Sequence, residues 1–355
     1  MRGVSVFDTC RNGVLGVDDY VLMPADREMV KYLFVLDWFW DEGAGEVRPC
    51  LNKDKVLFLQ RLLPVLEAVL ASDEVLFSVL GEGEGRKFKK TELGTRLFDV
   101  LHGGVLDFPR TYSDYKFNPF FDLLYSYLEK YRIIESMEWV RCSAGNGAES
   151  LSGLFNDFVS GMRADSRSVD FRERVKNYRR SVSKNYKSLM DYVSSVFVRH
   201  EKVQVLRVRL SYASQGAMGV SIKTAGRHRQ ALLKELSRGR LGPLLGYAWR
   251  FGWDGSMGWC NDVLIFMSPC LSKTDIELVE FIGRLWGSKI TGGVGVYYNF
   301  NESKKEGGLG GLGVVRSMDV IGMEGVRKMA VYMTKIDDYF KLSVAGVRSF
   351  GKGGL

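Results

Sequence analysis

The sequence predicts an α+β protein in which a mostly helical N-terminal unit precedes an antiparallel sheet with helices on one face. The first observation is the order of apolar patterns in residues 203–333, where strand-like and helix-like periods follow one another as β-α-β-β-α-β-β-α. The second is composition, because 46% of the 355 residues are hydrophobic, enough to bury a large core. The third is a difference in net charge between the two halves of the chain. Helices on one face of an antiparallel sheet are the simplest arrangement for this order of elements.

The charge difference predicts two units with different partners. Residues 1–162 contain 18 Lys and Arg against 25 Asp and Glu, a net charge of −7, whereas residues 163–355 contain 32 against 17, a net charge of +15. The small, glycine-bearing segment Ser143–Ser152 is the expected linker, so the units are residues 1–150 and 151–355. The basic unit suits a polyanion such as nucleic acid. The acidic unit does not, and its expected partner is another protein.

Hydropathy and cysteine usage indicate a cytoplasmic protein with no membrane partner. No apolar run approaches the roughly 18 residues that span a bilayer. The opening MRGVSVFDTC lacks the long apolar segment of a signal peptide. The five cysteines form no Cys-x-x-Cys pair, which favours reduced thiols over a disulfide framework or a zinc knuckle.

Apolar spacing and turn-forming residues define the elements expected in the acidic unit. Asp26 is a suitable N-cap for the first helix, and Pro64 bends the second. The polar, glycine-rich segment after the strand is typical of a loop. The expected elements are helices at Ala25–Trp40, Asn52–Ala71 and Pro119–Tyr131, a strand at Glu74–Leu80 and a loop at Gly81–Lys90.

The basic unit is expected to open with two helices, Leu151–Arg163 and Asp170–Val198, the second of which is rich in cations. Residues 163–209 contain 13 Lys and Arg against 5 Asp and Glu. Such a helix is either a solvated face or a surface that grips phosphates. The strand Val203–Tyr212 and the helix Ser221–Arg240 add further cations. The residues predicted to contact DNA are Arg172, Arg174, Lys176, Arg179, Arg180, Lys184, Lys187, Arg207, Arg209, Lys223, Arg227 and Arg229.

The segment Leu244–Met267 reads as two apolar strands joined by a glycine-rich turn, and it forms the centre of the predicted sheet. Near the start of the second strand, Cys260 and Asp262 point to the same face, because strand side chains alternate. Two such side chains on one face are a common way to build a metal site on a sheet. The alternative is a polar strand entrance with no chemistry.

Four more elements complete the predicted fold. Ser272 is the expected N-cap of an amphipathic helix. The glycine-rich segments that follow do not match a phosphate loop, because no Gly-Lys-Ser/Thr follows them. These elements are a helix at Ser272–Trp286, strands at Gly292–Phe300 and Gly307–Val315, and a helix at Val320–Met333.

Several motifs in the C-terminal half occur in the order and spacing of one protein family. They are VLRVRLSY at 205–212, LLGYAWR at 244–250, GWCND at 258–262, FIGRLWGSKITGGVGVYYN at 281–299, YMTK at 332–335 and GVRSFGKG at 346–353. On these motifs, residues 151–353 resemble the replication-initiator-like proteins of filamentous phages and cryptic prophages (the inovirus type). Residues 1–150 match no family by such motifs.

This resemblance implies a fold and a chemistry. The family is similar to the His-hydrophobe-His nucleases of rolling-circle replication, in which a five-stranded antiparallel sheet holds a divalent metal and a helix carries a nucleophilic tyrosine. Carried over to this chain, Tyr332 falls on the nucleophile and Lys335 on the lysine that assists with phosphate charge. A phenol is a weak nucleophile at neutral pH, so Mg²⁺ or Mn²⁺ would supply the activation. The DNA would be single-stranded or a hairpin.

The metal-binding positions depart from the family pattern. The two family histidines fall on Cys260 and Asp262, the third ligand falls near Gly252, and an Asp of the first strand falls on Arg209. Two functions stay open from the sequence: a phage-type replication initiator that nicks DNA through Tyr332, or a catalytically inactive relative that binds DNA or serves in assembly. A third reading is an interaction protein whose charge serves only solubility.

Overall fold

The computed structural model of the protein describes residues 37–41, 46–50, 54–83, 86–102, 114–140, 147–213, 219–254, 257–270, 272–302 and 310–353. Their contacts divide the chain into two compact units. We call residues 54–181 with 337–343 the helical unit, and the remaining residues, chiefly 182–336 and 344–355, the sheet unit.

The boundary between the units differs from the predicted one at 150/151. Helix α7 (Gly147–Ser166) begins inside the predicted linker, and its Asn156 exchanges two hydrogen bonds with the backbone of Phe77, at 3.2 and 2.7 Å. The following helix α8 (Val169–Arg199) runs through the boundary, which lies between Ser181 and Val182. A change in net charge along the sequence therefore does not mark the place where tertiary contacts change.

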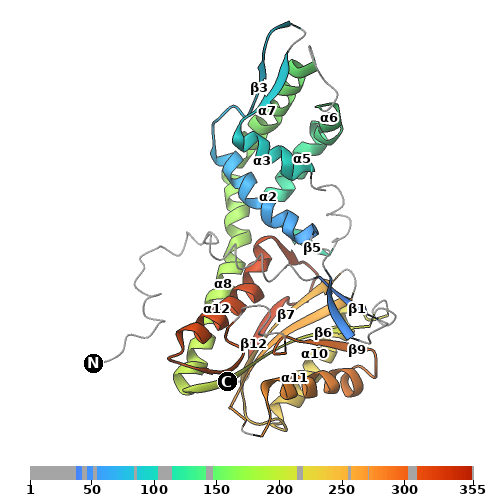
Figure 1. Ribbon diagram of the computed structural model, residues 1–355, viewed down its shortest axis with the longest axis vertical. Coiled ribbons are helices and arrows are strands. Elements are labelled where there is room, and N and C mark those ends of the chain that lie inside the picture. Colours follow the sequence, from blue (N-terminus) through green and yellow to red (C-terminus); the bar gives the residue numbers. More distant parts are fainter. Residues whose placement is uncertain are drawn as a thin grey trace, which may run out of the picture. The chain divides into compact units, whose positions relative to one another are not determined.

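The helical unit is built from helices α2, α3, α5, α6 and α7, the start of α8 and two short strand pairs (Figure 1). The prediction of a loop at Gly81–Lys90 is wrong for its last four residues, which form a strand paired with β3. Phe88 of this strand stacks on Phe77, with ring centres 5.5 Å apart. The predicted helix at Ala25–Trp40 falls mostly outside the described residues, and its last four residues are in strand β1. The bounds are α2 Asp54–Ala71, β3 Phe77–Leu80, β4 Lys87–Lys90, α3 Glu92–His102, β5 Tyr115–Phe117, α5 Pro119–Lys130, α6 Ile133–Val140 and β11 Phe340–Leu342.

The sheet unit contains a six-stranded antiparallel sheet in the order β10-β6-β8-β7-β12, in which β9 also pairs with β6. Strand β6 has two neighbours along one edge, β10 at its start and β9 at its end. A separate hairpin joins β1 and β2. The strands are β1 Asp37–Asp41, β2 Glu46–Cys50, β6 Lys202–Tyr212, β7 Leu244–Asp254, β8 Gly258–Met267, β9 Gly295–Asn299, β10 Gly313–Arg316 and β12 Phe350–Gly353.

Helices cover both faces of this sheet, so the prediction of helices on one face is wrong. Figure 1 shows α12 (Val320–Lys335) and the C-terminal end of α8 on one side, and α10 (Ile222–Ser237) and α11 (Asp275–Arg284) on the other. The physical reason is burial: all ten residues of β8 are buried, so each face needs its own apolar cover.

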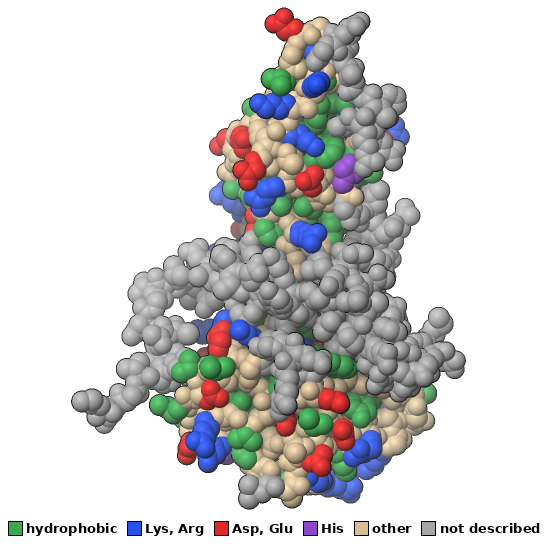
Figure 2. All heavy atoms as spheres, in the orientation of Figure 1, with side chains coloured by type: hydrophobic (Ala, Val, Ile, Leu, Met, Phe, Trp, Pro, Cys, Tyr) green, Lys and Arg blue, Asp and Glu red, His purple; other side chains and the backbone are tan. Residues whose placement is uncertain are grey.

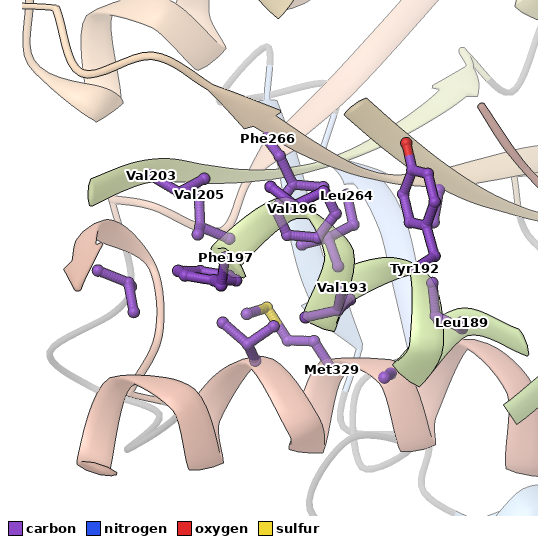
Figure 3. Packing of buried hydrophobic residues seen from close by; sticks show 14 of the residues in the cluster. Leu189, Tyr192, Val193, Val196, Phe197, Val203, Val205, Leu264, Phe266 and Met329 are labelled. Carbon is purple, nitrogen blue, oxygen red and sulfur yellow. The ribbon is translucent and has the colours of Figure 1, made fainter. Parts of the chain in front are cut away.

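The core on the α8 side joins the two helices to the central strands (Figure 3). Figure 3 shows side chains of α8, β6 and β8 meeting Met329 of α12. Full burial of each large apolar side chain contributes about 1.5–3 kcal/mol. Tyr192 also belongs to this core. Its hydroxyl accepts a hydrogen bond from the Tyr247 amide at 3.0 Å and donates one to the Gly353 carbonyl, so the buried polar atom is satisfied. The aromatic side chains of α8 labelled in this core are Tyr192 and Phe197.

The N-terminus of α11 lies two residues later than predicted. Thr274, and not Ser272, is the N-cap, and its hydroxyl accepts a hydrogen bond from the Glu277 amide at 3.2 Å. The Glu277 carboxylate accepts one from the Thr274 amide at 2.7 Å. This reciprocal pair satisfies two backbone donors, which a Ser at position 272 cannot do alone. The helix then continues as a π-helical turn, Leu285–Ile290.

Candidate functional site

The centre of the sheet places one carboxylate between two arginines. Asp262 of β8 is in register with Arg209 of β6 on one side and with Arg250 of β7 on the other. Side chains directly opposite one another on neighbouring strands lie within contact distance. Asp262 is 1% exposed, and both arginines are buried as well.

Asp262, Arg209 and Tyr332 of α12 form a closed set of hydrogen bonds. Arg209 donates from Nε to Oδ1 of Asp262 at 3.1 Å and from Nη2 to Oδ2 at 2.9 Å. The same Nη2 donates to the Tyr332 hydroxyl at 2.6 Å, and that hydroxyl donates to Oδ2 of Asp262 at 2.9 Å. Bidentate pairing of this kind is among the strongest polar contacts in proteins. The prediction that Asp262 faces the helix bearing Tyr332 agrees with these distances.

Arg207 completes the surroundings of this set. Its guanidinium lies 4.4 Å from the centre of the Tyr332 ring and 3.8 Å from that of Phe300. One of its nitrogens is 3.9 Å from Oδ1 of Asp262. We call Arg207, Arg209, Arg250, Asp262 and Tyr332 the central cluster. It holds three guanidinium groups and one carboxylate, all buried.

Burial and charge shift the pKa values in the central cluster in opposite directions. Burial alone would raise the pKa of Asp262, but the guanidinium groups, Arg209 first, outweigh it and hold that pKa below its ordinary value. Burial raises the pKa of Tyr332, and the positive charge of Arg209 offsets only part of that rise. Asp262 is therefore ionised and Tyr332 protonated at neutral pH.

The predicted metal site does not fit a divalent ion. Both oxygens of Asp262 accept hydrogen bonds from Arg209, so the carboxylate is occupied. The Cys260 thiol lies on the same strand face, 3.5 Å from the carbonyl oxygen of Gly252, and Gly252 has no side chain to offer. Within the described part of the chain, no group of three His, Cys, Asp or Glu is arranged to hold a metal. Arg209 thus pairs with both oxygens of the carboxylate that the family resemblance assigned to the ion.

The two predicted catalytic side chains of α12 are both buried and point to different neighbours. Tyr332 is 3% exposed and belongs to the central cluster. Lys335 is 2% exposed, and its ammonium lies 5.0 Å from the centre of the Tyr186 ring on α8. In this arrangement no phosphodiester reaches the phenolic oxygen. Both functional groups are therefore enclosed by the protein interior.

The cations predicted to contact DNA divide into exposed residues, the half-buried Arg179 and buried residues. Arg179 is ion-paired with Glu67 at 2.5 Å and with Asp338 at 3.3 Å. Arg207 and Arg209 lie in the central cluster, not at a surface where phosphate contacts are made, and that part of the prediction is wrong. Arg229 is 8% exposed. The exposed members of the predicted set are Arg172, Arg174, Lys176, Arg180, Lys184, Lys187, Lys223 and Arg227.

Sequence reasoning missed two members of this environment, Arg250 and Phe300. Arg250 had a detectable signal, because strand alternation in β7 places it on the same face as Ala248, in the middle of an otherwise apolar strand. Phe300 had none, since it follows β9 directly and meets Arg207 only through the folded chain.

Comparison of the chain with protein-family models, curated proteins and solved structures finds no match to any of them. The resemblance to phage replication initiators therefore stays a prediction from the motifs. Among the described helices, each is too short or too polar to span a bilayer.

Proposed function

We propose that this protein binds DNA without cutting it, as a non-enzymatic relative of the replication initiators that its C-terminal motifs resemble. One observation carries the non-enzymatic part. The guanidinium of Arg209 pairs with both oxygens of Asp262 and with the hydroxyl of Tyr332. The groups that a nicking reaction would need are thereby used to hold the interior of the sheet unit together.

Electrostatics supports this reading. Two unit charges 4 Å apart at an effective dielectric constant of 20 interact by about 4 kcal/mol, so one guanidinium at that distance opposes a divalent ion by about 8 kcal/mol. A metal beside Asp262 would face Arg207, Arg209 and Arg250 together. One carboxylate does not offset three such repulsions.

The charge of the sheet unit supports DNA as the partner. Residues 182–336 and 344–355 contain 24 Lys and Arg against 12 Asp and Glu, a net charge of +12, and residues 1–53 of the same unit bring its net charge to +9. Four of the exposed cations in this unit are Lys184 and Lys187 of α8 and Lys223 and Arg227 of α10. Basic surfaces bind the phosphate backbone by releasing its counterions.

The helical unit has a different balance. Residues 54–181 and 337–343 contain 20 Lys and Arg against 21 Asp and Glu, a net charge of −1. Figure 2 shows basic and acidic side chains interspersed over this unit. Such a surface gives phosphate no net attraction. We therefore assign DNA contact to the sheet unit and propose that the partner of the helical unit is another protein.

The experiment is incubation of the full chain with 5′-labelled single-stranded and hairpin DNA in Mg²⁺, Mn²⁺ or EDTA. We expect binding that falls as salt rises and is the same in EDTA, with no covalent protein–DNA product. A covalent product that the Tyr332→Phe variant fails to form would overturn the non-enzymatic proposal. Absence of binding at low salt would overturn the DNA-binding proposal.

A further inference from the structure

A groove with a cavity volume of about 460 Å³ lies on the α10 side of the sheet unit. It is formed by the first two turns of α10, by β7 and by residues 346–348. None of the described residues that line it is acidic. Its basic and aromatic lining residues are Lys223, Arg227, Arg229, Arg348, Trp249 and Phe251.

Arg229 lies against Trp249 and Phe251 at the inner wall of this groove. Its guanidinium carbon lies 3.6 Å from the centre of the Trp249 ring and 5.1 Å from that of Phe251. One of its nitrogens donates to Oδ1 of Asn261 at 3.4 Å. Burial lowers the pKa of Arg229 to about 10, so the side chain stays charged at neutral pH. The result is a fixed, planar cation backed by an indole ring.

Three further cations stand at the rim of the groove. Lys223, Arg227 and Arg348 are all exposed. Arg227 is oriented by Thr224, whose hydroxyl accepts a hydrogen bond from its guanidinium at 3.1 Å. The wall is thus planar and aromatic, whereas the rim is basic. Proteins that bind single strands combine the same two features, because bases stack on planar groups while cations follow the phosphates.

We infer that this groove binds single-stranded DNA, with one unpaired base against the guanidinium plane of Arg229 and the neighbouring phosphates on the rim cations. The volume lies within the usual range of small-ligand pockets and so suits a single nucleotide. A paired base is stacked inside its duplex and cannot enter. This inference rests on the proposed DNA binding and adds the place on the molecule where the DNA is bound.

The groove is independent of the central cluster. Trp249 and Phe251 alternate with Arg250 along β7, so they point to the opposite face of the sheet. DNA in the groove would therefore lie on the far side of the sheet from Tyr332. The groove thus lies apart from Tyr332, the position at which the family resemblance places the chemistry.

The test compares two double charge reversals in the full chain by fluorescence anisotropy. The first is Lys223→Glu with Arg227→Glu at the rim. The matched control is Arg199→Glu with Lys202→Glu, which are also exposed, lie in the same unit and change the charge equally. The probes are a labelled oligo-dT of about 15 nucleotides and a hairpin with the same number of phosphates.

We expect the unaltered chain to prefer oligo-dT, the rim variant to bind it at least about tenfold more weakly, and the control to change by less than about threefold. Equal weakening by the two double variants, or a preference for the hairpin stem, would refute the groove as the site while leaving DNA binding in place. An unaltered chain that binds neither probe would refute the proposed function, and this inference with it.

Discussion

Replacing Asp262 by Asn tests whether the central cluster is a structural ion pair. The substitution keeps the shape of the side chain and removes its negative charge. It leaves Arg207, Arg209 and Arg250 together in the interior, so the buried charge rises from a net +2 to +3. The amide nitrogen of the new side chain also cannot accept the hydrogen bonds that one carboxylate oxygen accepts from Arg209 and Tyr332.

The expected loss follows from the burial of the pair. Removing one partner of a buried salt bridge costs about 3–5 kcal/mol, because the other charge stays buried without compensation. Arg209 donates twice to Asp262, and Tyr332 donates once. The amide introduced by Asp262→Asn would keep one acceptor oxygen, so we expect a loss of about 3–5 kcal/mol in the free energy of unfolding and no larger.

The assay is urea unfolding of the full chain followed by tryptophan fluorescence. Four of the seven tryptophans lie on strands β7 and β8 or in the π-helical turn after α11: Trp249, Trp253, Trp259 and Trp286. The matched control is Asp191→Asn on α8, an exposed carboxylate in the same unit. Its expected effect is within about 0.5 kcal/mol. A loss below about 1 kcal/mol for Asp262→Asn, or one equal to that of the control, would show that Asp262 does not hold the cluster together.

Three further perturbations have defined outcomes. Tyr332→Phe removes a hydroxyl that is hydrogen-bonded to two charged groups, so it should lower the free energy of unfolding by about 1.5–3 kcal/mol and leave DNA affinity unchanged. A loss of DNA affinity that accompanies the loss of stability would place Tyr332 in the binding surface. The pKa of Asp262 is lower in the folded chain than its ordinary value of 3.8, so the stability that the ionised carboxylate contributes is complete above pH 3.8 and is lost as the pH falls through the folded pKa. Urea titrations at descending pH should therefore show that the difference in unfolding free energy between the unaltered chain and Asp262→Asn shrinks only below pH 3.8. A difference that does not change with acid would contradict this. Gly283→Ala on α11 should lower the thermal midpoint of unfolding, because the new methyl group would overlap the Tyr297 ring. Gly226→Ala on α10 should raise the midpoint, because its methyl group meets open space and alanine favours the helix. Similar shifts for both variants would refute the close packing of Gly283 against Tyr297.

Long periodic segments were predictable from the sequence because local preference and burial agree in them. Helix α2 begins two residues after the predicted start and ends at the predicted Ala71, with Pro64 inside it, and β6 extends the predicted strand by one residue. Strands β5, β11 and β12 have three or four residues each, and their pairing partners are distant in sequence. No local pattern predicts such strands, since tertiary contacts alone define them.

The second layer of helices had a signal in the sequence that remained unused. The segment Gly258–Met267 is apolar with little alternation, which indicates burial on both faces. The central cluster was half predictable: alternation places Cys260 and Asp262 on one face, and the motif order adds Tyr332. The role of Arg209 was not predictable, because a cation within an apolar strand is read as a surface residue until its buried carboxylate partner is known.

The pairing of β5 with β11 has a consequence for synthesis on the ribosome. Phe117 of β5 pairs with Phe340, and Asn118 donates a hydrogen bond to the carbonyl of Asp338 at 2.7 Å, across 220 positions of sequence. These partners leave the ribosome only after the strands and helices of the sheet unit up to α12. Until then the β5 edge is unpaired and its apolar side chains lack their final cover, a state that favours association with other chains. The first large unit to emerge is thus the last to be completed, and we expect the nascent chain to depend on holding factors late in translation.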